Sequence, residues 1–154
     1  EMIRLKTSVL LGCACRMGAH MAGADEDTAA ALYAYGENLG LAFQLRDDWL
    51  DTFGDPEVFG KPIGGDIRNR KKTWLFITAL AEAPGQMAEA LDDTDNAVAR
   101  VTEIYRSLKL DERCDALVEK YRADAVNALV PACIDDDARE YFIALAAKLS
   151  SRSK

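Results

Sequence analysis

The chain has 154 residues, 49% of them hydrophobic and 29% charged, a composition typical of an ordinary globular protein of one domain. Its net charge of -7 argues against nucleic acid or an anionic membrane as the main partner, because the overall field would repel both. The apolar segment 8–24 contains Arg16 and His20, so we predict neither a signal peptide nor a membrane-spanning helix.

Apolar residues recur at helical spacing along most of the chain, and no useful stretch alternates with period two, which predicts an all-α fold. The first helix is expected over residues 2–24, and a second, capped by Asp25 or Asp27, continues to about residue 51. Glycines and prolines interrupt residues 53–70, which we expect to form a long loop. The remaining helices are expected at 71–83, 86–92, 96–108, 112–133 and 136–150. Because Glu1 already lies within a helical pattern, we expect the chain to be a piece of a longer protein.

The second predicted helix is apolar on nearly every side, which favours a central place in a helical bundle. Gly36 and Gly40 lie on nearly the same side of this helix as Asp47. The space that these glycines leave is expected to admit either a ligand or a closely packed helix.

The cysteines stand at positions 13, 15, 114 and 133, and the chain has one histidine, His20. These residues lack the spacing of a zinc site. We interpret the cysteines as buried or half-buried thiols in a reducing cytosol, and His20 as a packing residue.

A glutamine and three aspartates share one side of the second helix at its end. At about 100° per residue, Gln44, Asp47, Asp48 and Asp51 fall within an arc of roughly 100°. A helix C-terminus disfavours anions, and carboxylates one turn apart repel one another, so the cluster needs a cation. We predict that the three aspartates bind Mg²⁺, which accepts such ligands and keeps positions open for phosphate oxygens. The alternative is a solvated acidic face.

The loop that follows contains Lys61 and Asp66 among its glycines and leads to Lys71 and Lys72. Loops of this length are usually functional or disordered, and we interpret this one as a lid. Its lysines would add positive charge to an anion that the metal already holds. Together the acids and the loop predict a metal-bridged phosphate or diphosphate site.

The segments that make up this site resemble the second aspartate-rich region of trans-isoprenyl diphosphate synthases, and most closely that of farnesyl diphosphate synthases. They are FQLRDDWLD at 43–51, GK at 60–61, GGDI at 64–67 and KKTW at 71–74. Lys6-Thr7 matches a Lys-Thr pair that these enzymes have one helix earlier. The resemblance covers only the second half of such an enzyme. Residues 1–154 are therefore expected to be the C-terminal half of a single domain with the all-α isoprenoid synthase bundle.

The resemblance implies head-to-tail prenyl transfer, in which an allylic diphosphate is joined to isopentenyl diphosphate. Mg²⁺ held by Asp47, Asp48 and Asp51 would grip the allylic diphosphate, whose departure leaves an allylic cation. A cytoplasmic homodimer is implied for the full-length enzyme. The chain alone is expected to be inactive, because the first aspartate-rich motif is absent.

The family's site residues fall on matching positions of this sequence. Lys6 and Lys61 would contact the diphosphate, whereas Thr7 and Gln44 would lie near the cation. Phe43 would line the isopentenyl side. Asp66 and Lys71 would be lid residues that bind the substrate.

Two positions depart from the family pattern. Arg46 replaces a neutral polar residue and is expected to face solvent beside the acids. Gly65 replaces a larger residue and is expected to loosen the lid.

Two alternatives from other classes remain. One is a non-catalytic partner subunit that resembles a prenyl synthase, and the other is a terpene cyclase. The intact second motif, together with Lys61 and Lys6-Thr7, favours the synthase over the partner subunit, and the lysine-rich lid with Lys-Thr upstream favours it over the cyclase.

Overall fold

The computed structural model describes residues 1–55, 57 and 63–150, so the predicted site residue Lys61 and the basic tail at 151–154 lie outside the described part. The regular elements of the described part are helices, with no strand among them. The predicted all-α fold is confirmed. None of the described helices is both long and apolar enough to cross a membrane.

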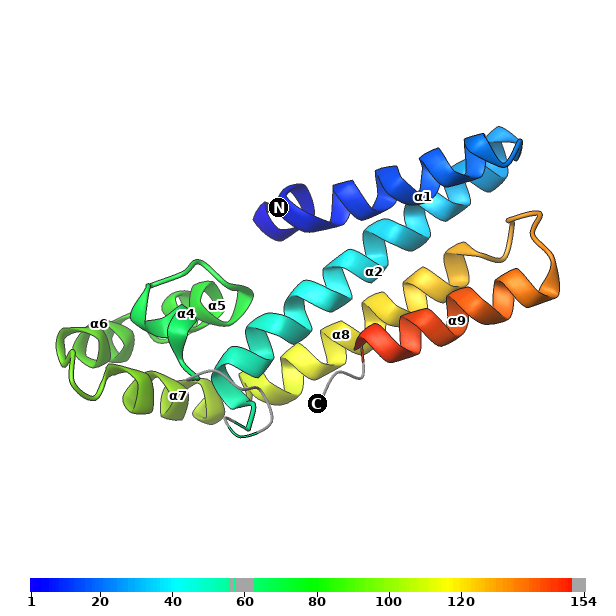
Figure 1. Ribbon diagram of the computed structural model, residues 1–154. Coiled ribbons are helices and arrows are strands. Elements are labelled where there is room, and N and C mark those ends of the chain that lie inside the picture. Colours follow the sequence, from blue (N-terminus) through cyan, green and yellow to red (C-terminus); the bar gives the residue numbers. More distant parts are fainter. Residues whose placement is uncertain (56, 58–62, 151–154) are drawn as a thin grey trace. The chain divides into compact units, whose positions relative to one another are not determined.

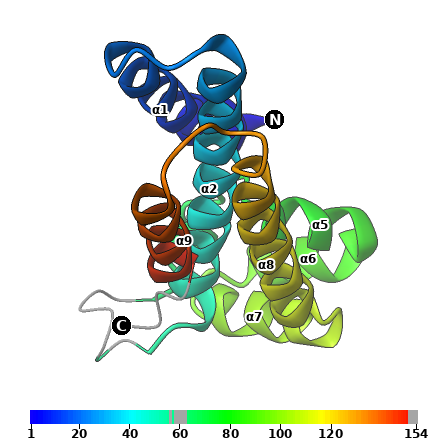
Figure 2. The same cartoon turned by 90° about the vertical axis from the view of Figure 1, so that its right-hand side faces the viewer.

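The chain divides into two compact units, of which the first comprises Glu1–Gln44 and Leu117–Arg152. Its helices are a short π-helix, η1 (Arg4–Ser8), followed by α1 (Val9–Met21), most of α2 (Glu26–Phe53), most of α8 (Leu110–Ala128) and α9 (Asp136–Ser150). Figures 1 and 2 show α1, α8 and α9 running alongside α2. The prediction that the second helix is central in a bundle agrees with this arrangement.

The core of the first unit is built mainly from alanines and leucines of α1, α2, α8 and α9 and of the turn that follows α8. Its buried members are Ala19, Ala29, Leu32, Tyr35, Leu39, Ala125, Leu129 and Ala146. Tyr35 is 1% exposed; its ring packs edge-on against Phe142 at 5.1 Å between centroids. Its hydroxyl donates a 2.8 Å hydrogen bond to the Phe142 carbonyl, which satisfies the one polar group that this ring brings into the core.

Glycines let η1 and α1 approach α2 closely. A Cβ atom added to Gly36 would lie 2.7 Å from the Leu11 carbonyl oxygen, and one added to Gly40 would lie 2.6 Å from the Ser8 Cα. Such distances leave no room for a side chain. Of the two expectations for these glycines, the structure therefore favours the closely packed helix over the ligand.

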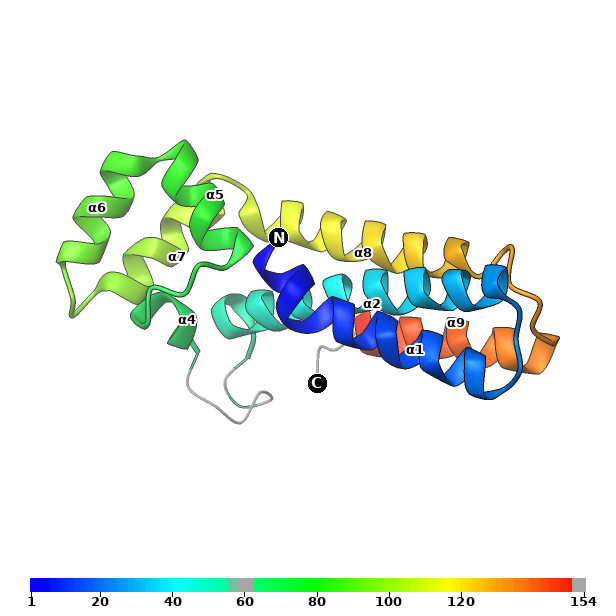
Figure 3. The same ribbon diagram turned by 90° about the horizontal axis from the view of Figure 1, so that it is seen from above.

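The second unit comprises Leu45–Ala116 and, in the part that the structure describes, contains the end of α2, the start of α8 and further helices between them. These are α4 (Gly65–Arg68), α5 (Trp74–Glu82), α6 (Pro84–Asp92) and α7 (Ala97–Ser107), which Figure 3 shows grouped together. Leu75, Met87, Val101, Tyr105 and Leu110 are each at most 1% exposed and form its core.

Several helix ends differ from prediction for identifiable reasons. Helix α5 starts at Trp74 and not at Lys71, because the Thr73 hydroxyl caps it by accepting a 3.1 Å hydrogen bond from the Phe76 amide. Helix α8 ends at Ala128 and not near residue 133, because turns follow in which the Arg139 guanidinium donates to the Leu129 and Ala132 carbonyls. The predicted Asp25 cap is confirmed by a 2.7 Å hydrogen bond from the Thr28 amide.

Three expectations about small polar side chains were wrong. Cys13 and Cys133 are exposed, not buried, although all four cysteines are free thiols as expected. The His20 side chain is 48% exposed and lies 3.7 Å from a Glu26 carboxylate oxygen, so it is not a packing residue.

Candidate functional site

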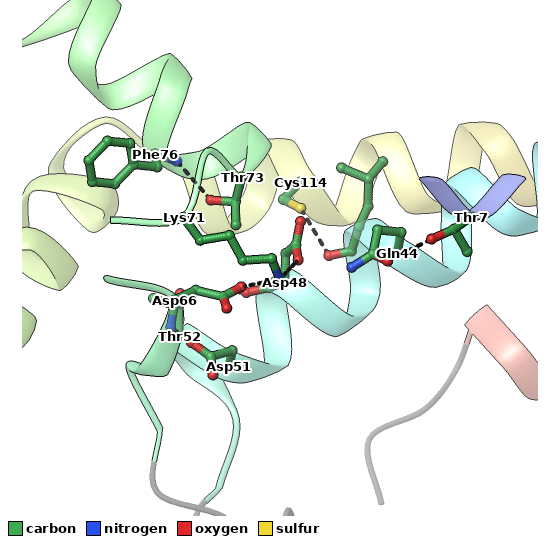
Figure 4. Close-up of polar contacts among 11 residues, drawn as sticks. Thr7, Gln44, Asp48, Asp51, Thr52, Asp66, Lys71, Thr73, Phe76 and Cys114 are labelled. Atoms are coloured by element: carbon green, nitrogen blue, oxygen red, sulfur yellow. Dashed lines mark hydrogen bonds and ion pairs between the residues drawn. The ribbon is translucent and has the colours of Figure 1, made fainter. Parts of the chain in front are cut away.

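Two acids and a lysine meet in the second unit. The Lys71 Nζ atom donates hydrogen bonds of 3.0 Å to Asp48 Oδ1 and 2.8 Å to Asp66 Oδ2. Figure 4 shows the ammonium between the two carboxylates, which come from different elements. Asp48 and Asp66, which are 18 residues apart in sequence, thus bind one cationic group.

Local backbone structure sets the position of this lysine. Helix α4 ends in a Schellman motif, in which the Lys71 amide bonds to the Asp66 carbonyl at 2.9 Å and the Arg70 amide to the Ile67 carbonyl at 3.0 Å. Arg70 adopts the left-handed conformation with φ 49°, a place that glycine usually fills. The turn returns Lys71 to the acid five residues before it.

This ion pair is partly shielded from solvent. The Asp48 side chain is 1% exposed, that of Asp66 19% and that of Lys71 30%. Desolvation opposes the charge on Lys71, but its hydrogen bonds with Asp66 and Asp48 outweigh that effect and raise the pKa of the ammonium above its usual value. The buried Asp48 carboxylate is thereby kept next to a permanent positive charge.

Asp51 has different partners, the backbone amides of Gly64 and Asp66. Its Oδ2 atom accepts a 2.8 Å hydrogen bond from the Asp66 amide, and its carbonyl accepts a 2.5 Å hydrogen bond from the Gly64 amide. Burial raises the pKa of the Asp51 carboxyl, and the nearby Asp66 charge adds to this effect, while the hydrogen bond from the Asp66 amide works against it.

Gly64 and Gly65 permit this close approach. Gly64 has φ 79°, and a Cβ atom there would lie 2.4 Å from Val98 Cγ1. A Cβ atom on Gly65 would lie 3.2 Å from Asp51 Oδ1. Gly65, which we expected to loosen the lid, is therefore tightly placed against the acid.

The predicted trio does not share one partner. Asp47 is half-buried and makes no hydrogen bond or ion pair within the described residues, whereas Asp48 binds Lys71 and Asp51 binds backbone. No group of three potential metal ligands is gathered closely enough for an ion among the residues that the structure describes.

The residues present nevertheless fit a hard divalent cation. Mg²⁺ in phosphate-binding sites is usually held by one or two carboxylates plus substrate oxygens, so a closed protein cage is not required. Asp48 and Asp66 already converge on one cationic group, and Asp47, next to Asp48 in sequence, has a carboxylate that no described residue binds. These oxygen donors are the chemistry that Mg²⁺ prefers.

Another pair of predicted site residues meets in the first unit. The Thr7 hydroxyl donates a 3.1 Å hydrogen bond to the Gln44 side-chain oxygen, although the two residues are 37 positions apart. Phe43 is half-buried and Lys6 is exposed, so the Lys6 ammonium is accessible.

Arg46 was expected to face solvent, and this was wrong. Its side chain is 18% exposed, and its Nη1 atom lies 2.7 Å from Asp115 Oδ1 in α8. The guanidinium also lies 5.2 Å from the centre of the Trp49 ring, whose Nε1 donates to the Asp111 carbonyl at 3.3 Å. The contribution of α8 was missed because Asp111 and Asp115 lie more than sixty residues away and carry no distinguishing pattern.

Comparison with known proteins places these features in a family. The Polyprenyl synthetase profile matches residues 1–108. The (2E,6E)-farnesyl diphosphate synthase of Mycobacterium bovis is 48% identical over 116 residues, which cover 73% of this chain and 32% of that protein.

Solved structures give the same result. The polyprenyl synthase of Caulobacter crescentus CB15, complexed with calcium and isoprenyl diphosphate, matches with a TM-score of 0.86 and 34% identity over 99% of this chain and 48% of that one. The geranylgeranyl pyrophosphate synthase of Corynebacterium glutamicum, complexed with isoprenyl diphosphate and magnesium, matches with a TM-score of 0.84 and 33% identity over 97% and 44%.

The chain spans about a third of the length of the Mycobacterium relative and about half of the solved chains. Both the sequence match and the fold match cover most of the present chain, including FQLRDDWLD and the acids that bind Lys71. The chain therefore belongs to the polyprenyl synthetase family.

Proposed function

We propose that the protein is a prenyltransferase that condenses an allylic diphosphate with isopentenyl diphosphate, and that this chain is the C-terminal half of its domain. One observation carries the proposal beyond the family match. Two carboxylates, one of them almost fully buried, converge on a single cationic position on a helical scaffold. Such an arrangement suits a metal-bound diphosphate.

The proposed metal ligands are Asp47, Asp48 and Asp51. Mg²⁺ bound there would neutralise the charge that grows on the departing diphosphate. Two structural neighbours were solved with isoprenyl diphosphate, one together with calcium and one with magnesium, which supports a divalent cation in this family. Asp51 would also keep the returning loop in place through the Asp66 amide.

The remaining residues would bind and orient the substrates. Lys6, Lys61 and Lys71 would supply positive charge to the allylic diphosphate, and Asp66 would position Lys71. Thr7 and Gln44 would present their hydrogen-bonded polar groups to the cation that ionisation leaves. Phe43 would line the isopentenyl side. The protein would act as a cytoplasmic homodimer, and the free thiols are consistent with a reducing compartment.

The proposal is tested by incubating the full-length protein with Mg²⁺, radiolabelled isopentenyl diphosphate and a short allylic diphosphate. A longer labelled prenyl diphosphate is expected. Diphosphate release without isopentenyl diphosphate would indicate a terpene cyclase instead. No turnover would indicate a non-catalytic partner subunit. The 154-residue chain assayed alone is expected to be inactive.

A substitution separates the metal role from a structural one. Asp47→Ala is expected to lower turnover by roughly 100- to 1,000-fold, the loss typical when one group that stabilises transition-state charge is removed. Because Asp47 has no polar partner in the described part of the chain, the helical circular dichroism signal should not change. Asp92→Ala, in an exposed acid of α6, is the matched control and should leave turnover unaltered.

A further inference from the structure

We infer that the Lys71 ammonium is a counterion of the Asp48 and Asp66 carboxylates in the metal-free protein. A divalent cation that binds at this site displaces the ammonium, and the displaced ammonium is then free to bind diphosphate. The inference rests on the proposed function, since it assigns an order of events at the same site. It differs from a plain substrate-binding role because it makes Lys71 a competitor of the metal.

The geometry carries the first step. The Lys71 ammonium is within hydrogen-bonding distance of both carboxylates, at 3.0 Å from Asp48 and 2.8 Å from Asp66. The Asp48 carboxylate is 1% exposed, so bulk water does little to stabilise its charge. The Lys71 ammonium offsets part of this negative charge near the C-terminal end of α2, where the helix dipole is unfavourable to anions.

Competition is the second step. A divalent cation bound to the Asp48 carboxylate would come within a few ångströms of the ammonium, and the two positive charges would repel strongly in this partly buried place. The metal and Lys71 therefore cannot both hold their positions at full strength. Each must lower the affinity of the site for the other, and this coupling is reciprocal.

The third step requires that the Lys71 side chain can move away from the two carboxylates. Its backbone is fixed by hydrogen bonds, with the Lys71 amide donating to Asp66 and the Thr73 amide donating to the Lys71 carbonyl. Its side chain is a flexible four-carbon stem that is 30% exposed, so rotation of side-chain torsions alone moves the ammonium. The released ammonium then carries its charge to a phosphate that binds at the same metal.

The inference predicts effects of opposite sign from one substitution. Lys71→Met should bind metal ions alone more tightly, because the competitor is gone, yet should bind the allylic diphosphate less tightly. A residue that serves only the fold or only the substrate would not tighten metal binding. Lys71→Arg keeps the positive charge and should retain weak metal binding.

Binding of Mn²⁺ to the full-length protein, followed by the electron paramagnetic resonance signal of the free ion, tests this directly. Lys71→Met is expected to lower the Kd for Mn²⁺ by roughly fivefold or more, the size of an ordinary coupling between sites. Lys72→Met is the matched control, because Lys72 is exposed and neighbours Lys71 in sequence, and its Kd should equal that of the unaltered protein.

Failure of the inference differs from failure of the proposed function. Saturable Mn²⁺ binding by the unaltered protein with equal or weaker binding by Lys71→Met would overturn the counterion role and leave the metal site standing. Absence of saturable binding in both proteins would overturn both proposals.

A measurement on the unaltered protein guards against a misfolded variant. Reductive methylation of lysines, quantified by mass spectrometry, reports how accessible each ammonium is. Mg²⁺ without substrate should increase labelling of Lys71 several-fold relative to Lys72. An unchanged ratio at saturating Mg²⁺ would show that the metal does not displace Lys71.

Discussion

The Asp51 carboxylate accepts a 2.8 Å hydrogen bond from the Asp66 amide, so a proposed metal ligand also binds the backbone at the start of α4. The Asp51 backbone carbonyl also accepts a hydrogen bond from the Gly64 amide. The acid therefore links the end of α2 to the start of α4 by two hydrogen bonds. This double role means that substitutions of Asp51 affect both metal binding and stability, and the two effects can be separated.

Asp51→Asn and Asp51→Ala are expected to differ in stability but not in metal binding. Asparagine keeps an oxygen that accepts the Asp66 amide, whereas alanine leaves that amide without its acceptor, at a cost of about 1 kcal/mol in the free energy of unfolding. Urea denaturation would measure this difference. Both variants lose the charge, so both should bind Mn²⁺ weakly. Equal stability of the two variants would show that the hydrogen bond to Asp66 contributes nothing.

Helix positions and the acid cluster could be predicted because they depend on local patterns. Apolar spacing predicted α9 at its observed bounds, and the arc shared by Asp47, Asp48 and Asp51 follows from helical geometry alone. The glycines and prolines after residue 53 predicted an irregular segment up to residue 70, and this was wrong for residues 65–68, which form α4.

The partners of the acids could not be predicted from local patterns. Lys71 reaches Asp48 through a Schellman turn whose left-handed residue is Arg70, and an arginine there gives no sequence signal for such a turn. The pairing of Arg46 with Asp115 depends on tertiary packing between elements 69 residues apart. Arg46 thus looked like a solvent-facing side chain until its partner was located.

Arg46 and Asp115 are expected to be energetically coupled. A double-mutant cycle with Arg46→Met and Asp115→Asn should give a coupling of about 0.5–1 kcal/mol, because the carboxylate is half-exposed and solvent weakens the pair. Arg46→Met should also change the fluorescence of Trp49, since the guanidinium lies over its ring. Glu119→Gln is the control for Asp115→Asn, because the Glu119 carboxylate pairs with Arg122 and not with Arg46. Additive effects of the two substitutions would contradict the pairing.

Two glycines in neighbouring helices should respond to alanine in opposite ways. At Gly40 a methyl group would meet the Ser8 Cα at 2.6 Å, and the resulting overpacking should cost about 1–3 kcal/mol. At Gly18 no atom lies within 4 Å, so alanine should stabilise the protein by up to about 1 kcal/mol through its higher helix propensity. Thermal unfolding of both variants measures the contrast. A neutral Gly40→Ala would show that the end of η1 does not pack closely there.

The Cys114 thiol should make the protein less stable at alkaline pH. It is fully buried, with its sulfur 3.7 Å from the Leu45 carbonyl oxygen. Burial, reinforced by the charge of Asp115, raises the pKa of this thiol to about 12 from its usual 9.0. The folded state therefore keeps the neutral thiol while the unfolded chain ionises first. The stability that Cys114 contributes is complete below pH 9 and is lost as the pH rises towards 12.

Between pH 8 and pH 10 this linkage should lower the free energy of unfolding by about 1 kcal/mol, and Cys114→Ala should remove that part of the pH dependence. Urea denaturation at both pH values measures it, because the difference between pH values cancels the constant cost of the smaller side chain. Cys133→Ala is the control, since that thiol is exposed and should leave the alkaline slope unaltered. An equal slope in the unaltered protein and Cys114→Ala would mean that the thiolate is accommodated in the folded state, which its complete burial against the Leu45 carbonyl argues against.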